Sequence, residues 1–421
     1  MKRYDTYTES GISWIGKVPS HWEMRKLKYL FSERSEKGFP NEPILCSTQK
    51  YGVIPQSMYE NRVVAVNKGL EGLKLVRKGD FVISLRSFQG GIEYAHYQGI
   101  ISAAYTILQL NEGASSAYLR YLLKSQPFIQ LLQVCVIGIR EGQNINYSLL
   151  RKNFIPVPPQ EEQEEIVAYL DEKCAQIDRY VASLEERIER LGELRQALIA
   201  EAVTRGINPQ APLRPSGIPW LGEIPKHWEV KRLGSCFTEN TESNADQLFN
   251  EAYKFNYGTL VRKLEDTSSQ EVIDTYSKYT VLKEGDIVIN GLNLNYDFVS
   301  QRVAQASQPG LITSAYLVLT PRQHVNQAYY CFLFKAIDSQ KLFHGMGTGI
   351  RLTLSYKYLK PQNLPVPPQA EQEAIVAYLD EKTTQIDRYT GQLEEMIRQM
   401  RDLRQTIISE AVTGKICVLP N

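Results

Sequence analysis

Apolar residues recur every seven positions in two stretches of this chain, which end near Gly206 and Gly414. A seam of this period, kept over five heptads, predicts a long helix that packs against another helix in a coiled coil. The seam residues are Leu170, Ile177, Leu184, Leu191 and Leu198 in the first stretch, and Leu379, Ile386, Leu393, Met400 and Ile407 in the second.

One seam position in each stretch holds an arginine, Arg195 in the first and Arg404 in the second. The guanidinium either extends along its aliphatic stem to solvent, or it pairs with a carboxylate of the other helix and fixes the register. The pattern leaves both interpretations open.

The two heptad stretches belong to an internal repeat, residues 156–206 and 365–415, in which about 33 of 51 aligned positions are identical. Each copy begins with Pro-Val-Pro-Pro, and proline is tolerated in the first turn of a helix. A long repeat with so much chain between its copies indicates two equivalent large units rather than a short-period solenoid.

The segments before each repeat copy are more divergent and mix strand and helix patterns. Gly79-Asp80 and Gly285-Asp286 each precede an apolar run, which predicts a turn into a buried strand. Residues 117–132 have a helical pattern. Residues 10–27 and 216–233 contain Gly, Pro and a His-Trp-Glu triplet, and we expect packed loops in which the histidines do not bind a metal.

An apolar seam must be buried, and the seam of the other copy is the nearest partner. Either orientation is possible, but antiparallel packing would relate the halves by a pseudo-twofold axis. The predicted fold class is α+β, with two mixed α/β domains separated by a long antiparallel two-helix coiled coil and related by a pseudo-twofold internal repeat. The predicted domains are residues 1–155 and 207–364, with spacer helices at residues 156–206 and 365–421.

Composition adds little except through the placement of charge. The net charge of the 421 residues is only +1. Residues 1–155 carry 20 Lys/Arg against 12 Asp/Glu, whereas residues 156–206 carry 6 against 12. A polyanion would therefore meet the variable segments rather than the repeats.

The location of the protein is predicted from what the sequence contains. The 6 cysteines are scattered and form no Cys-x-x-Cys pair, as in reduced proteins of the cytoplasm. The N-terminal residues have no apolar secretory core, and no apolar run reaches the length of a membrane span. We expect a cytoplasmic protein with no membrane association.

Two variable units, each followed by Pro-x-Pro-Pro-x-x-Glu-Gln and a long heptad helix, resemble the specificity subunits of type I restriction-modification enzymes. The matching motifs begin at Pro156 and Pro365 and include Glu162-Gln163 and Glu371-Gln372. The Gly-Asp turns match too, as does Glu-Ala-Val-Thr at the end of each repeat. The resemblance covers essentially the whole chain.

The resemblance implies a bipartite, asymmetric site in double-stranded DNA, with one half read by each recognition domain. It also implies docking of two methyltransferase subunits on the repeats, with motor-nuclease subunits joining that complex. The chain itself would have no catalytic residue, cofactor or metal. The sequence agrees, because it has no phosphate-binding loop of the GxxxxGK[ST] type and no Asn-Pro-Pro-aromatic motif.

Candidate DNA-binding residues are the long or amide side chains on loops of the variable segments, since these can reach base edges in a groove. They are Arg86, Ser87, Gln89, Arg140, Gln143, Asn144 and Asn146 in the first segment, and Asn290, Asn293, Asn295, Arg351, Thr353 and Lys357 in the second. Arg140 and Arg351 occupy equivalent positions, which suits phosphate contact better than base choice. Any one of these residues could instead be an ordinary loop or capping residue.

Candidate docking residues are those that the two repeats keep identical away from the seam. They are Tyr169, Glu172, Asp178 and Arg179, and Tyr378, Glu381, Asp387 and Arg388. Two equal surfaces would hold two copies of one partner, although a solvated acidic face is the simpler interpretation. The alternative function is a pseudosymmetric coiled-coil scaffold for proteins with no role in DNA, and a self-contained restriction enzyme would need a catalytic domain that these motifs do not supply.

Overall fold

The chain folds as two compact units, which we call unit 1 (residues 1–184 and 394–421) and unit 2 (residues 185–393). The computed structural model describes residues 2–60, 69–85, 87–111, 113–137, 144–265, 269–349 and 352–419. Two long helices, α6 (Gln160–Arg205) and α11 (Gln369–Val412), each contribute to both units.

The remaining elements divide between the units. Those of unit 1 are β1 (Tyr7–Glu9), β2 (Lys17–Pro19), β3 (Glu23–Lys26), α1 (Leu27–Leu30), β4 (Phe31–Arg34), β5 (Leu45–Thr48), β6 (Gly52–Pro55), β7 (Lys74–Val76), β8 (Phe81–Ile83), α2 (Ser87–Gly90), β9 (Glu93–Tyr94), β10 (Gly99–Ile101), β11 (Thr106–Leu110), α3 (Ser116–Leu122), α4 (Gln126–Val134), β12 (Val136–Ile137), β13 (Asn144–Ile145), α5 (Tyr147–Leu150) and β14 (Phe154–Val157). Those of unit 2 are β15 (Leu213–Pro215), β16 (Glu223–Pro225), β17 (Glu229–Arg232), α7 (Leu233–Cys236), β18 (Phe237–Glu239), β19 (Tyr253–Asn256), β20 (Thr259–Arg262), α8 (Gln270–Tyr276), β21 (Thr280–Leu282), β22 (Ile287–Ile289), β23 (Val303–Gln305), β24 (Gly310–Ile312), β25 (Leu317–Pro321), α9 (Gln327–Ser339), α10 (Tyr356–Leu359) and β26 (Asn363–Val366).

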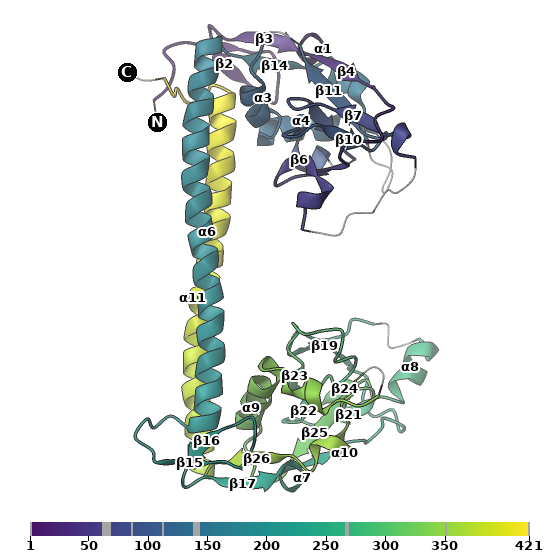
Figure 1. The fold of residues 1–421 in the computed structure, drawn as a ribbon, viewed down its shortest axis with the longest axis vertical. Coiled ribbons are helices and arrows are strands. Elements are labelled where there is room, and N and C mark those ends of the chain that lie inside the picture. Colours follow the sequence, from purple (N-terminus) through teal and green to yellow (C-terminus); the bar gives the residue numbers. More distant parts are fainter. Residues whose placement is uncertain are drawn as a thin grey trace. The chain divides into compact units, whose positions relative to one another are not determined.

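Each unit is built on a four-stranded antiparallel sheet (Figure 1). The strand order is β4-β11-β8-β9 in unit 1 and β18-β25-β22-β23 in unit 2. The predicted turns before β8 and β22 are confirmed, with Gly79 and Gly285 at φ 97° and 89°. The buried carboxylate of Asp80 accepts from the Arg77 backbone N–H at 2.8 Å, and Asp286 accepts from the Lys283 N–H at 2.9 Å.

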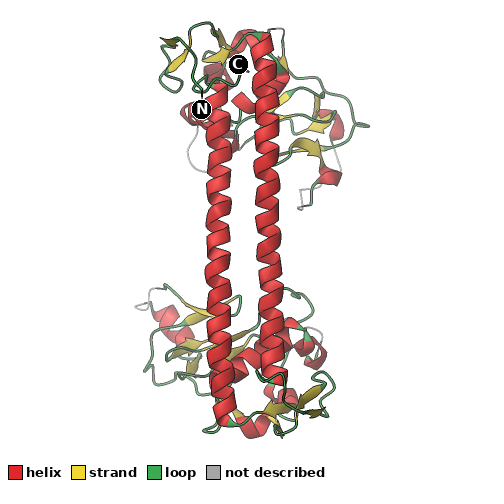
Figure 2. Ribbon diagram, turned by 90° about the vertical axis from the view of Figure 1, so that its left-hand side faces the viewer, coloured by secondary structure: helices red, strands yellow, loops and turns green. Residues whose placement is uncertain are grey.

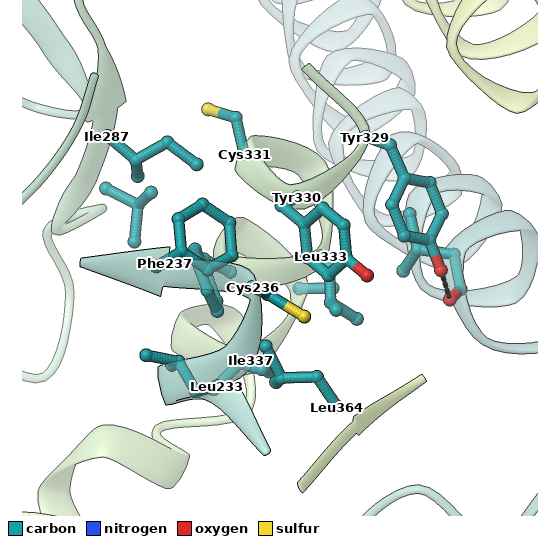
Figure 3. Packing of buried hydrophobic residues seen from close by; sticks show 14 of the residues in the cluster. Leu233, Cys236, Phe237, Ile287, Tyr329, Tyr330, Cys331, Leu333, Ile337 and Leu364 are labelled. Atoms are coloured by element: carbon teal, nitrogen blue, oxygen red, sulfur yellow. Dashed lines mark hydrogen bonds between the residues drawn. The ribbon is translucent and has the colours of Figure 1, made fainter. Parts of the chain in front are cut away.

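The core of unit 2 lies where the sheet meets α9 and the long helices. Phe237 of β18 packs edge-on against Tyr330 of α9, with ring centroids 5.3 Å apart (Figure 3). Tyr329, the residue before Tyr330 in α9, points to the long helix α6 and donates a hydrogen bond to the Val203 carbonyl at 2.8 Å. The apolar ends of the repeat helices therefore complete the core of the variable part.

The long helices have close to the predicted extent, 46 residues in α6 and 44 in α11. In each unit the first half of one helix lies beside the last half of the other (Figure 2). Gly206 and Gly414 follow the helices at φ 74° and 70°, the left-handed conformation in which glycine commonly ends a helix.

One prediction about local structure is wrong. Residues 10–27 and 216–233 are not only loops, because they contain the strands β2, β3, β16 and β17. Two of these strands pair with distant partners, β3 with β14 and β17 with β26, and so their local sequence does not reveal them. The helical pattern of residues 117–132 is confirmed, as two helices, α3 and α4, with a proline in the first turn of α4.

Candidate nucleic-acid interface

A carboxylate at the start of each long helix joins that helix to the variable part of its unit. In unit 1, Glu162 lies 2.7 Å from His21 Nε2 and accepts a hydrogen bond from Trp22 Nε1 at 3.0 Å. In unit 2, Glu371 has the same two contacts, at 2.7 Å to His227 and 3.0 Å to Trp228. We call these arrangements the helix clamps.

The helix clamps explain why the His-Trp-Glu triplets repeat. The hydroxyl of Tyr4 also donates to Glu162, and burial together with this carboxylate raises the pKa of Tyr4. Within the ranges described, no group of three or more His, Cys, Asp or Glu could hold a metal ion. The paired histidines contact the carboxylates at the start of the two long helices.

The glutamine after each clamp carboxylate performs a second repeated task. Gln163 accepts from the Ser115 N–H at 2.7 Å and donates to the Pro158 carbonyl at 2.8 Å. Gln372 makes the equivalent contacts with the Asn326 N–H and the Pro367 carbonyl, at 3.0 and 2.8 Å. The Glu-Gln motif is therefore a structural connection between the helix and the variable part.

The arginines of the heptad seam pair across the two long helices. In unit 1, Arg404 Nε lies 3.1 Å from Asp178 Oδ1, and in unit 2, Arg195 lies 3.4 Å from Asp387. The two pairs are equivalent positions of the repeat. The alternative of a carboxylate partner that fixes the register thus fits the structure better than an arginine that extends to solvent.

The other predicted docking residues have the same environment in both copies. Glu172, Arg179, Glu381 and Arg388 are exposed, whereas Tyr169 and Tyr378 are half-buried. Tyr180 and Tyr389 are also repeated, and they are 40% and 45% exposed. This tyrosine pair is not among the predicted docking residues, although its identity is visible in the repeat.

In unit 1, two hollows flank the turn between β5 and β6. The smaller, of about 520 Å³, contains the predicted residues Ser87 and Gln89. Gln89 is exposed, but Ser87 is buried and its hydroxyl accepts from the Ser84 N–H at 2.9 Å. Arg86 lies outside the described residues.

The larger hollow of unit 1, of about 910 Å³, lies on the other side of this turn and extends to Arg404. Its cations are mostly paired, Lys124 with buried Glu93 at 2.7 Å and Arg120 with Asp171 at 2.6 Å. Burial raises the pKa of Glu93, although Lys124 opposes this shift.

The structure brings separate candidates of unit 1 together. Helix α2, which carries Ser87 and Gln89, packs against strand β13, which begins with exposed Asn144. Asn146 instead caps helix α5, because its side chain accepts from the Leu149 N–H at 3.3 Å. Arg140 and Gln143 lie outside the described residues.

The candidates of unit 2 also come together from two loops. The backbone N–H of Leu294 donates to the Leu352 carbonyl at 3.2 Å, which places the loop of Asn290, Asn293 and Asn295 beside Thr353. Asn293 is exposed at φ 51°, and Asn290 accepts from the Leu292 N–H at 3.3 Å. Lys357 is exposed on α10, and Arg351 lies outside the described residues.

A tyrosine-glycine turn recurs in both units and was missed by the sequence analysis. Tyr51-Gly52 joins β5 to β6, and Tyr257-Gly258 joins β19 to β20. Both tyrosines are exposed, by 42% and 75%. The glycines have φ 72° and 79°, and a Cβ on Gly52 would lie 2.6 Å from the Tyr94 carbonyl. The shared dipeptide was the available signal, but the surrounding sequences differ too much for it to stand out.

Comparisons with known proteins agree on one family. The family described as "Type I restriction modification DNA specificity domain" matches residues 19–190 and 225–398. The chain is 24% identical to the type I restriction enzyme MjaVIII specificity subunit of Methanocaldococcus jannaschii over 82% of its length and 80% of that protein. It is 22% identical to the putative type I restriction enzyme MjaX specificity subunit of the same organism, over 96% of both chains.

A solved structure supports the fold. A chain from work described as "Structural basis underlying complex assembly and conformational transition of the type I R-M system" is similar with a TM-score of 0.66 at 17% identity, over 94% of this chain and 98% of that one. A search of the helices in the described part of the chain finds none with the length and apolar character to cross a membrane.

Proposed function

The chain belongs to the family of type I restriction-modification DNA specificity proteins, and from this premise we propose how its two units divide the reading of DNA. Membership confirms the predicted family and the role in DNA sequence specificity. We propose that each unit reads one half of a bipartite, asymmetric site in double-stranded DNA.

The observation that carries this proposal is the contrast between constant and variable parts. Both units keep the same sheet order, the same helix clamp and the same tyrosine-glycine turn. The loops after β8 and β22 differ, reading Leu-Arg-Ser-Phe-Gln in one and Gly-Leu-Asn-Leu-Asn in the other. One framework with two different loop sets suits two different half-sites.

The reading parts correspond to residues 1–155 and 207–364. In unit 1 we assign DNA contact to Gln89, which lines the smaller hollow, to Asn144, whose strand packs against the helix of Gln89, and to Tyr51, which lines the larger hollow. In unit 2 we assign it to the loop of Asn293 and its neighbour Thr353. Amide and hydroxyl side chains can bond base edges, and tyrosine can also contact the sugar-phosphate backbone.

We further propose that α6 and α11 form an antiparallel coiled coil that acts as a spacer between the recognition domains. Two equivalent ion pairs, Arg404 with Asp178 and Arg195 with Asp387, support the antiparallel register. The exposed residues that the two helices share form two equivalent surfaces, and each surface would dock one methyltransferase subunit. Motor-nuclease subunits would join this assembly. The chain would be its non-catalytic specificity component.

The test is reconstitution of the full chain with a methyltransferase subunit of its own system, followed by mapping of methylated adenines across a genome. We expect one asymmetric motif of two short specified blocks with an unspecified gap. An active complex that methylates without such a motif would refute the proposal. Binding of the methyltransferase with no DNA preference would favour the protein scaffold.

A further inference from the structure

The loop after β22 in unit 2 ends in an exposed apolar tip. Tyr296, Phe298 and Val299 are 76%, 57% and 90% exposed. Several exposed apolar side chains on one short loop usually mark a binding surface. Resting on the proposed function, we propose that this tip enters a groove of the half-site read by unit 2 and contacts thymine methyl groups there.

The backbone of the tip is held firmly although its side chains are exposed. The carboxylate of Asp297 accepts from the N–H groups of Val299 and Ser300, at 3.0 and 2.9 Å. These bonds lower the pKa of Asp297 to about 2. The Phe298 ring stacks on His344, with centroids 4.6 Å apart. A loop that is already ordered loses less conformational entropy when it binds.

Arg302 anchors this loop from beneath. Its guanidinium is buried and donates to the carbonyls of Asn290, Leu292 and Asp297, at 3.1, 2.9 and 2.9 Å. The backbone N–H of Arg302 donates to the buried carboxylate of Asp338 on α9 at 2.7 Å. The side chain of Arg302 thus holds the loop together, and its backbone ties the end of the loop to α9.

The difference between the units indicates DNA as the occupant. A partner protein that is present in two copies would need like surfaces, which the helices offer and this tip does not. After the equivalent strand unit 1 has Leu85, which is 46% exposed, followed by Ser87 and Gln89, and among the described residues of this loop no second large apolar side chain is exposed. The part of the complex expected to differ between the units is the DNA half-site.

Two neighbouring features also favour DNA. A Cβ on Gly258 would lie 2.7 Å from Gln301 Cγ, so the tyrosine-glycine turn adjoins the loop. Gln301 in turn donates to the backbone carbonyl of Lys335 at 3.3 Å, which ties the same loop to α9. An exposed tyrosine beside an apolar tip suits sugar-phosphate and base contacts together.

The chemistry of the tip selects one feature of the bases. Valine and phenylalanine side chains cannot form hydrogen bonds, so they cannot distinguish the donors and acceptors of base edges. The thymine 5-methyl group in the major groove is the base feature that apolar side chains recognise. The tip would therefore favour T·A pairs at the positions it touches.

The test uses the full chain in its methyltransferase complex and a duplex that contains the mapped site. Each thymine of the site is replaced in turn by deoxyuridine, which lacks only the methyl group. We expect wild-type binding to fall about fivefold, the order expected for one buried methyl group, at one or more positions of a single half-site. Val299→Ala should bind more weakly and should no longer respond to deoxyuridine at those positions.

A matched control is Leu248→Ala, which removes a leucine that is 79% exposed in another loop of unit 2. This variant should respond to deoxyuridine as the wild type does. If no thymine responds, or if Val299→Ala and the wild type respond alike, the apolar tip does not read methyl groups although the site itself is still bound. If the wild-type complex has no bipartite site, the proposed function fails, and the tip proposal fails with it.

Discussion

Units 1 and 2 hold their helices in the same way but present different chemistry in the loops after their central strands. Both clamps consist of a carboxylate bound by a histidine and a tryptophan. After β8, unit 1 has exposed Leu85 and Gln89 with buried Ser87, whereas after β22 unit 2 has the exposed apolar tip. The framework can stay constant because it holds the helices in the same way in both units, and the difference between the loops is what the proposed reading of two different half-sites requires.

The largest effect is expected from shortening the two long helices while residues 1–155 and 207–364 are left unchanged. Deleting one heptad from each helix, residues 183–189 and 393–399, keeps the seam in phase. At 1.5 Å per residue the loss is roughly 10 Å, or about three base pairs of B-DNA. We expect methylation at the original motif to be lost and a motif with the same two blocks and a shorter gap to appear.

Methylome mapping of the deletion variant provides the measurement. A deletion in only one helix is the control, and it should disrupt the complex rather than shorten the gap. An unchanged gap in the double deletion would show that the helices do not set the spacing.

The two clamps should differ in strength because their carboxylates differ in burial. The side chain of Glu162 is 5% exposed and that of Glu371 is 21% exposed. Glu162→Ala leaves the buried Trp22 N–H without its acceptor, which costs about 1–3 kcal/mol of unfolding free energy. Glu371→Ala should cost less, because Glu371 is itself more exposed to water and because Glu162→Ala also removes the bond from the Tyr4 hydroxyl.

Urea unfolding of the full chain measures both variants. Glu162→Gln keeps an acceptor for Trp22 and should recover part of the loss. Equal destabilisation by the two alanine variants would contradict the assigned role of burial.

The number of buried tyrosines whose hydroxyls bond backbone carbonyls differs between the units. In unit 1 the Tyr118 hydroxyl lies near two carbonyls, 2.9 Å from Val412 and 3.2 Å from Pro156. In unit 2 Tyr329 donates a hydrogen bond to the Val203 carbonyl, and Tyr330 donates one to the Pro365 carbonyl. A hydroxyl has one proton to donate, so Tyr118→Phe should cost about 1 kcal/mol, and the double variant Tyr329→Phe/Tyr330→Phe about twice as much.

The same unfolding measurement tests this ratio, with Tyr29→Phe as a control because Tyr29 is 61% exposed. A Tyr118→Phe variant that is as destabilised as the double variant would show that the shared hydroxyl makes two full hydrogen bonds.

The smallest expected effect concerns the pH dependence of the unit 2 tip. The folded pKa of Asp297 is about 2, below its usual 3.8, because its carboxylate accepts backbone N–H bonds. The tip is therefore fully stabilised above the unfolded pKa, and this contribution is lost as the pH falls through the folded value. Carboxyl NMR titration should give an Asp297 pKa near 2, and Asp297→Asn at neutral pH should speed amide exchange of Val299 and Ser300. An ordinary pKa would show that the tip is not held by this carboxylate.

Several features were predictable from local sequence because they depend on periodicity. The heptad seam gave the two long helices, and the Gly-Asp turns gave the entries to β8 and β22. The strands β3 and β17 were not predictable in this way, since their partners lie more than a hundred residues away. The role of Glu162 as the acceptor for His21 and Trp22 was not predictable either, because these two residues come from a distant segment of the chain.

The sequence by itself determined that the molecule has two equivalent halves with constant helices and variable inserts, since a repeat is visible without any contact being known. Only the tertiary structure decided which residues are exposed and which are anchors. Arg302 reads in sequence like any loop arginine, yet it is buried beneath its loop, while Val299 is exposed at the tip. Exposure is a property of all the chain segments that surround a side chain, and no local pattern contains it.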